Sequence, residues 1–225
     1  MGDVVSLTGR RARKVVSRPP VPARGPVTFF FDLACPYTYL AAERVDRLFA
    51  GVRWTPVIAD ALQMGTTAGD GEQLAAAELA AERRAAVLRM PLVWPDRTPA
   101  PARAAMRVAA YAARHDRAAA FVLAAGRLAF CGGFDIDDPD ILAEASAAAS
   151  LSLDECLHAA GDRALDGPME AAGRALLAQG ADRIPALKVG RTLFCGEHRL
   201  SEAATVARGQ VVLHHAADPV TPSAG

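Results

Sequence analysis

The chain has 225 residues, of which 52% are hydrophobic and 22% are charged, and its 25 basic side chains balance 25 acidic ones. This length and apolar content suffice to bury a core, which excludes disorder of the whole chain and fits one domain with an inserted sub-domain. A formal net charge of zero argues against a nucleic-acid partner, because phosphate contacts need a basic surface. No apolar run approaches the roughly 18 residues that span a membrane, so no membrane partner is expected.

The first 26 residues have the composition of a flexible basic tail. Residues 10–14 read RRARK, and the proline-rich residues 19–26 follow them. No apolar stretch follows the Arg10-Arg11 pair, as an export signal would require, so a cytoplasmic protein is expected. The folded domain is predicted to span residues 27–210, and residues 211–225 to form a C-terminal tail.

The folded part begins with the signs of a β-α-β unit. Residues 27–31 read VTFFF, a short apolar run that predicts a buried strand. Apolar residues then recur at helical spacing over residues 37–49, and Gly51 is predicted to end this helix. The alternation in residues 52–58 predicts a second strand, joined to the first by a right-handed crossover.

The middle of the chain, about residues 60–180, is alanine-rich and is predicted to be an all-helical insertion. Asp138 and Pro139 have the order of a cap and a first-turn proline, whereas Gly167-Pro168 is predicted to separate the last two helices. The predicted helices cover residues 72–89, 103–115, 118–130, 138–150, 154–164 and 169–179.

After Gly180 the pattern changes back to strands. Residues 184–189 and 192–195 flank Gly190-Arg191, a two-residue turn suited to a hairpin, and residues 200–208 begin a last helix. The order is therefore β-α-β, a helical insertion, then β-β-α. This order predicts an α/β chain with a thioredoxin-like fold and an all-helical insertion between its two halves.

Cys35 is the most informative residue, because it comes shortly after the first predicted strand and is followed by Pro36 at the start of a helix. Unpaired N–H groups and the positive end of the helix dipole stabilise an anion at this position, which favours a reactive thiolate. The alternative is a buried structural thiol. The other cysteines, Cys131, Cys156 and Cys195, form no C-x-x-C pair, so neither a metal site nor a disulfide scaffold is expected.

Three segments, taken in order, resemble the DsbA superfamily, and the branch of kappa-class glutathione transferases and 2-hydroxychromene-2-carboxylate isomerases looks closest. The first is residues 31–40, FDLACPYTYL, which is similar to the strand-to-helix motif of the family. The second is residues 130–142, with the turn FDIDDP, which resembles a loop between lid helices. The third is residues 183–200, which resembles a cis-proline strand followed by a hairpin and a G-x-x-R turn.

The resemblance implies that Cys35 is the catalytic thiol. Dithiol members carry a second cysteine three residues later, where this chain has Thr38, so no local resolving thiol exists. Thr38 is a candidate hydrogen-bond donor to the Cys35 thiolate or a helix cap. Cys195 is a candidate resolving thiol, with plain strand packing as the alternative.

The resemblance also assigns binding residues. Pro185 would be cis, which would leave the Ile184 backbone free to pair with an extended thiol or peptide. Glu197 would take the place of an acidic residue that holds the amine of glutathione, and His198 with Arg199 would bind an anionic group or form a solvated turn. The expected binding set is Pro36, Tyr37, Ile184, Pro185, Glu197, His198 and Arg199.

Three functions stay open from the sequence. The first is an oxidoreductase that works through Cys35 alone: Cys35 attacks a disulfide, and an external small thiol then releases it. The second is an isomerase or transferase that uses glutathione or another low-molecular-weight thiol as cofactor. The third is a catalytically silent binding protein with the same fold. The expected partner is a small thiol or disulfide, and a second copy of the chain is a further candidate partner.

Overall fold

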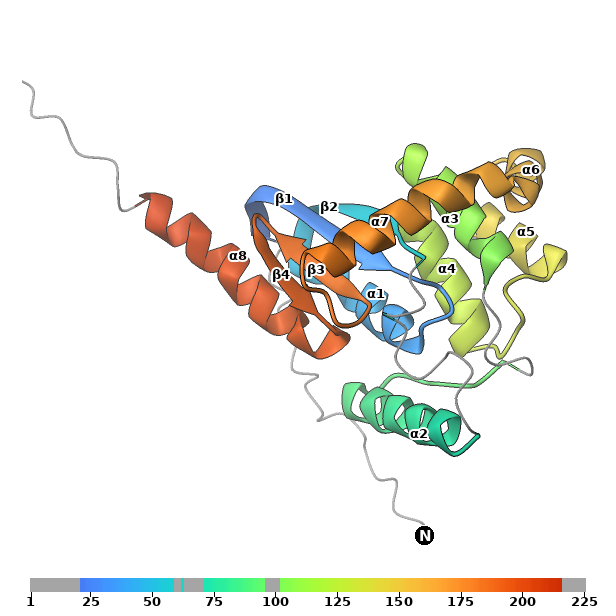
Figure 1. The fold of residues 1–225 in the computed structure, drawn as a ribbon, viewed down its shortest axis with the longest axis horizontal. Helices are drawn as coiled ribbons and strands as arrows, with labels where there is room; N and C mark the ends of the chain where they lie inside the picture. The colour runs from blue at the N-terminus through green and yellow to red at the C-terminus, as the bar shows by residue number, and fades with distance from the viewer. Residues whose placement is uncertain (1–20, 59–61, 63–70, 96–101, 216–225) are drawn as a thin grey trace, which may run out of the picture.

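The computed structural model describes residues 21–58, 62, 71–95 and 102–215. The fold alternates a strand-rich beginning and end with a helical middle (Figure 1). Its elements are β1 (Val21–Phe31), α1 (Pro36–Leu48), β2 (Phe49–Pro56), α2 (Gly71–Leu88), α3 (Arg103–Arg114), α4 (Ala118–Phe130), α5 (Pro139–Ala148), α6 (Leu153–Gly161), η2 (Arg163–Leu165), α7 (Asp166–Ala178), β3 (Ala186–Val189), β4 (Thr192–Cys195), η3 (Glu197–Arg199) and α8 (Leu200–His215).

The four strands form one mixed sheet in the order β2-β1-β3-β4. β1 runs parallel to β2, and the α1 crossover joins the two, whereas β1 with β3 and β3 with β4 are antiparallel. Gly190 has a φ of 59° in the two-residue turn between β3 and β4, a conformation that glycine adopts at low cost. This arrangement confirms the predicted thioredoxin-like fold.

The alternation of side chains along β1 gives the sheet two apolar faces. Phe29 and Phe31 point into the large core, which α1 and α8 cover together with helices of the insertion. Phe30 points to the opposite face and packs against a smaller cluster that contains Leu176 of α7 and Cys35. The smaller cluster therefore lies on the side of the sheet where α1 begins.

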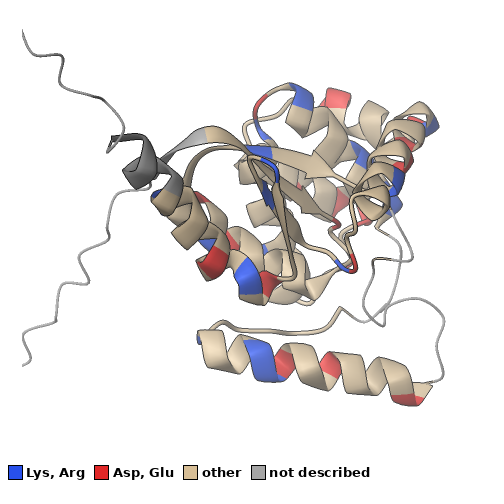
Figure 2. Cartoon of the chain, turned by 60° about the vertical axis from the view of Figure 1, so that its left-hand side comes forward, with Lys and Arg blue, Asp and Glu red and all other residues tan. Residues whose placement is uncertain are grey.

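The helices between β2 and β3 form the predicted insertion. Helices α3, α4, α5 and α6 pack on one another beside the sheet, and α4 also packs against α1. Gly126 of α4 faces Tyr39 of α1, and a Cβ at Gly126 would lie in ordinary van der Waals contact with Tyr39 at 3.4 Å. α2 lies at an edge of the fold and contacts α1 (Figures 1 and 2). Charged residues of both signs are distributed over the helices (Figure 2).

The first strand pair differs from the prediction at its start. β1 begins at Val21, six residues before the predicted start at Val27, and β2 begins at Phe49. Gly51 lies within β2 with a φ of 67° and does not cap α1. The register of β1 on β2 shifts between Pro22 and Val27, and a glycine at positive φ accommodates such a bulge.

Two helix limits in the second half also differ. α7 begins at Asp166 and includes Gly167-Pro168 in its first turn, because a proline there loses only an N–H that has no partner within the helix. α8 continues to His215, beyond the predicted end at Arg208. The tails were predicted at residues 1–26 and 211–225, but residues 21–26 belong to β1 and residues 211–215 to α8, which corrects both limits. The remaining parts of the predicted tails, residues 1–20 and 216–225, lie outside the described residues. Over the described residues, no helix has the length and apolar character needed to cross a membrane.

Candidate active site

A short turn connects the end of β1 to α1 and places Cys35 at the helix start. The Cys35 N–H donates to the Asp32 carbonyl at 3.2 Å, and the Ala34 N–H donates to an Asp32 carboxylate oxygen at 2.9 Å. Pro36 then occupies the first helical position, and the Thr38 N–H donates to the Cys35 carbonyl at 2.9 Å. Proline suits this position because its fixed φ matches the helix. The turn therefore holds the thiol at the N-terminus of α1, as predicted.

The Cys35 thiol is neutral, which corrects the predicted thiolate. The side chain is 3% exposed, and its Sγ donates to the Ile184 carbonyl at 3.7 Å. Burial raises the pKa of Cys35 to about 12; the Thr38 and Tyr37 N–H groups act to lower this pKa, and the Asp32 carboxylate raises it further. Desolvation of the thiolate thus outweighs the stabilisation that the helix start supplies.

Because the pKa of Cys35 is raised in the folded state, the thiol stabilises the fold below pH 9, and this stabilisation is lost towards pH 12. Over this range the unfolded chain releases the proton first, at about 1.4 kcal/mol per pH unit. We expect the stability of wild type relative to Cys35→Ser to fall by at least about 1 kcal/mol between about pH 8.5 and about pH 10.5. Urea unfolding of both proteins at both pH values measures this difference. A constant difference would contradict the raised pKa.

The loop at Ile184-Pro185 packs directly on Cys35. The Ile184–Pro185 peptide bond is cis. The Ile184 N–H donates to the Leu62 carbonyl at 3.1 Å, and its carbonyl accepts from the Cys35 thiol. The expectation of a free Ile184 backbone is therefore wrong, because both of its polar groups already have partners. The Pro185 carbonyl likewise accepts from the Gly196 N–H at 2.8 Å.

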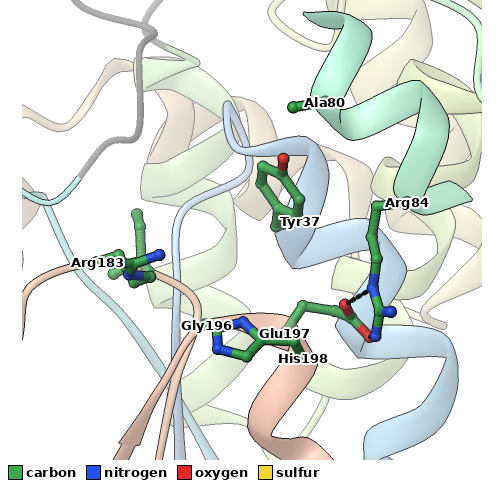
Figure 3. A pocket seen from close by; sticks show the side chains of 8 residues that line it. Tyr37, Ala80, Arg84, Arg183, Gly196, Glu197 and His198 are labelled. Atoms are coloured by element: carbon green, nitrogen blue, oxygen red, sulfur yellow. Dashed lines mark hydrogen bonds and ion pairs between the residues drawn. The ribbon is translucent and has the colours of Figure 1, made fainter. Parts of the chain in front are cut away.

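A cavity of about 250 Å³ lies beside this loop, between α1, α2 and η3. Tyr37 from α1 stands in its wall, between Ala80 and Arg84 of α2 and the ring of His198 (Figure 3). Burial raises the pKa of Tyr37, and a charged Cys35 would raise it further. The cavity is lined by Tyr37, Ala80, Arg84, Arg183, Ile184, Gly196, Glu197 and His198. Four of the predicted binding residues therefore meet at one cavity.

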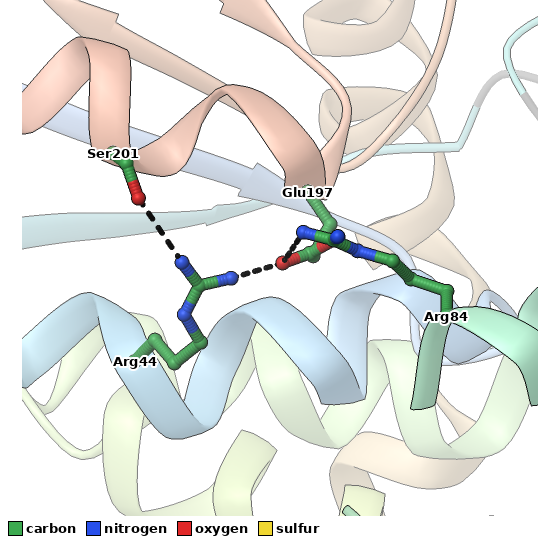
Figure 4. A network of polar contacts seen from close by, with 4 residues as sticks. All are labelled: Arg44, Arg84, Glu197 and Ser201. Atoms are coloured by element: carbon green, nitrogen blue, oxygen red, sulfur yellow. Dashed lines mark hydrogen bonds and ion pairs between the residues drawn. The ribbon is translucent and has the colours of Figure 1, made fainter. Parts of the chain in front are cut away.

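Glu197 lines this cavity, but its carboxylate is held by two arginines (Figure 4). The residue is 2% exposed and accepts from Arg44 of α1 and from Arg84 of α2, whose Nε lies 2.5 Å from Oε2. Arg44 also donates to Ser201 Oγ at 3.3 Å. The expectation that Glu197 holds an amine is corrected: its charge joins α1, α2 and η3 and fixes Arg84 at the cavity wall.

Cys195 and Arg199 line a neighbouring cavity of about 410 Å³. Arg183 and His198 belong to the walls of both cavities, so the two adjoin. The Arg199 guanidinium donates to the Glu202 carboxylate at 2.6 and 2.7 Å and lies over the Phe194 ring. Cys195 is half-buried and packs against the small apolar cluster that contains Cys35, and all four cysteines are unpaired.

Four lining residues were not predicted: Ala80, Arg84, Arg183 and Gly196. Gly196 has a φ of 89°, and a Cβ there would lie 2.7 Å from the His198 ring, so the position requires glycine. Arg183 directly precedes the Ile184-Pro185 loop, and its charge next to that motif is a signal that could have identified it. Arg84 comes from the insertion and has no signal in the sequence. Over the described residues, no cluster of side chains could hold a metal ion.

Solved structures share this fold at low sequence identity. A 2-hydroxychromene-2-carboxylate isomerase is 20% identical with a TM-score of 0.68, and the match covers 84% of this chain and 97% of that chain. A probable DsbA oxidoreductase from Streptomyces coelicolor is 21% identical with a TM-score of 0.63, over 88% and 93%. The cytosolic disulfide reductase DsbM from Pseudomonas aeruginosa is 18% identical with a TM-score of 0.60, over 84% and 99%.

The sequence itself matches a protein family over most of its length. No curated protein matches the chain significantly. The model of the DSBA-like thioredoxin domain, however, matches residues 26–206, from the first strand into the last helix. The chain therefore belongs to the family of DSBA-like thioredoxin domains.

Proposed function

We propose that the protein is a thiol-dependent isomerase or transferase that binds a glutathione-type small thiol beside Cys35. The protonated state of Cys35 carries this proposal, because a neutral S–H at a helix start can donate a hydrogen bond to a bound sulfur anion. The fold is shared with a 2-hydroxychromene-2-carboxylate isomerase and with DsbM, of which a structure with glutathione exists.

The residues around Cys35 fit a small anionic thiol. The Thr38 hydroxyl is buried and, like the Tyr37 and Thr38 N–H groups, faces the Cys35 sulfur and acts to lower its pKa. These groups form a set of donors for a thiolate. Arg84, Arg183 and His198 supply cationic or donor groups for carboxylates at the adjoining cavity, whose volume is about 250 Å³.

A bound thiol of this class would supply a nucleophilic sulfur. The role of this chain is to keep that sulfur charged and oriented. The contact from Cys35 Sγ to the Ile184 carbonyl is long, at 3.7 Å, so little energy is lost when the S–H turns to another acceptor. Donors aimed at a thiolate lower its pKa, and Tyr37 lines the adjoining cavity.

The position of Cys195 favours a second candidate, disulfide reduction. Cys195 packs against the cluster that contains Cys35. In this cycle the Cys35 sulfur would bond to one sulfur of a disulfide, and the other would leave and take up a proton. Cys195 would then displace the bound thiol, and two external thiols would reduce the resulting Cys35–Cys195 disulfide. The raised pKa of Cys35 slows the first step.

The proposal is tested by turnover of wild type and Cys195→Ser with reduced glutathione and other small thiols. The substrates are 2-hydroxychromene-2-carboxylate, followed by absorbance, and hydroxyethyl disulfide. We expect thiol-dependent isomerisation that Cys195→Ser leaves unchanged. Disulfide reduction that Cys195→Ser abolishes would replace the proposal by the second candidate. If the protein binds a thiol but turns over neither substrate, both enzymatic functions are excluded and a catalytically silent binding protein remains.

A further inference from the structure

A third cavity, of about 490 Å³, lies between α1, the end of α2 and the end of α4. It shares no lining residue with the cavity beside Cys35. Arg44 lines the third cavity and pairs with Glu197, which lines the cavity beside Cys35 together with Arg84 (Figure 4). The proposed reaction does not use the third cavity.

The lining of the third cavity is strongly cationic. Four arginines and one carboxylate, Glu43, line it. The Glu43 carboxylate accepts from Arg127 at 2.5 and 2.9 Å, and Arg44 pairs with Glu197. Within the described part of the chain, Arg47 and Arg89 have no ion-pair or hydrogen-bond partner for their guanidinium groups. Two charges therefore remain for a ligand.

The remaining wall of this cavity is apolar or uncharged. Tyr39 is 3% exposed, and its hydroxyl donates to the Pro91 carbonyl at 3.1 Å and lies 3.0 Å from the Cys131 sulfur. Leu88 and Met90 add aliphatic surface, and Cys131 is half-buried at the wall. A ligand that fits has a negative group and a compact apolar body.

Arg89 is held at the cavity by an uncommon backbone conformation. It follows the last residue of α2 with a φ of 57°, a region that glycine normally occupies at helix ends. Its N–H donates to the Ala86 carbonyl at 3.0 Å. A glycine would relieve this strain, so stability alone favours glycine at this position. Ligand binding explains an arginine here better than stability does.

We propose that the cavity is a second ligand site, which binds an aromatic or aliphatic phosphate or carboxylate. The anionic group lies between Arg47 and Arg89, and the apolar body rests on Met90 and Pro91 beside Cys131. Guanidinium groups suit both anions because they donate two parallel hydrogen bonds to either.

Calorimetry with phenyl phosphate, benzoate and uncharged benzyl alcohol tests this site on the full chain. We expect one molecule of an anion to bind and the alcohol not to bind. Tighter binding of phenyl phosphate would assign a phosphate, and tighter binding of benzoate a carboxylate. Arg47→Gln and Arg89→Gly should each weaken binding about tenfold, as loss of one charged hydrogen bond does. Arg89→Gly also suits the backbone, so misfolding cannot explain its effect.

The matched control is Arg83→Gln, which removes the same charge from an exposed position of α2 outside the cavities described here. It should bind the anion as wild type does. Equal effects of Arg83→Gln, Arg47→Gln and Arg89→Gly would reduce the binding to general electrostatics and overturn the proposal. Absence of binding by both anions, or equal binding of the alcohol, would overturn it as well.

The Cys131 thiol offers a second readout that does not depend on activity. Iodoacetate and iodoacetamide form the same carbon–sulfur bond with release of iodide, but only iodoacetate is anionic. The ratio of the iodoacetate rate to the iodoacetamide rate, measured by peptide mass spectrometry, should be higher at Cys131 than at Cys195. It should fall in Arg47→Gln and Arg89→Gly, and phenyl phosphate should slow both reactions at Cys131. An unchanged ratio in these variants would contradict the site.

Discussion

Cys35→Ser is expected to keep thiol-dependent isomerisation within about threefold of wild type, whereas Cys35→Ala should lose about 100-fold. Cysteine and serine can both donate a hydrogen bond from the helix start to a sulfur anion, whereas alanine cannot. The neutral state of Cys35 in its buried site makes serine a close substitute for the thiol. Steady-state turnover of the three proteins at saturating thiol measures this effect.

The same variants distinguish a hydrogen-bond donor from a nucleophile. If Cys35 is the nucleophile, serine and alanine are equally inactive, and wild type forms a mixed disulfide with oxidised glutathione at neutral pH. We expect instead that intact mass shows little mixed disulfide at Cys35 under these conditions, because the thiolate is scarce. Rapid, reversible addition at Cys35 together with an inactive Cys35→Ser would refute the donor role.

Glu197→Gln is expected to lower the free energy of unfolding by about 3 kcal/mol, at the lower end of the range for breaking a buried ion pair. The substitution keeps the shape of the side chain but leaves Arg44 and Arg84 without their shared anion. Their side chains are 24% and 29% exposed, so water compensates part of the loss. Urea unfolding monitored by circular dichroism measures the change.

Glu43→Gln is the matched control, because Glu43 also pairs with an arginine but on a more exposed surface. Its expected cost is below about 1 kcal/mol. Glu197→Gln should also raise the KM for the thiol, since Arg84 is no longer fixed at the cavity wall. Equal stability losses in the two variants would show that the Glu197 pairs contribute no more than a surface pair.

Much of the fold follows from local sequence. The apolar run at residues 27–31, the helical spacing after Pro36 and the hairpin turn at Gly190 are properties of neighbouring residues, and the structure confirms the strand, helix and turn that they predict. The placement of Cys35 at a helix start is local in the same sense. Two of the missed limits are at Gly51 and Gly167-Pro168, where glycine and proline permit more than one local structure.

The sequence by itself determined the order of elements, the family resemblance and the position of the thiol, because these depend on residues close together in the chain. Only the tertiary structure decided the protonation of Cys35, since the residues that bury it are distant in the chain and include Ile184, 149 residues away. It also decided that Glu197 pairs with Arg44 and Arg84, which lie 153 and 113 residues from it. Desolvation and ion pairing depend on which distant groups fill the space around a charge, and local periodicity carries no information on that.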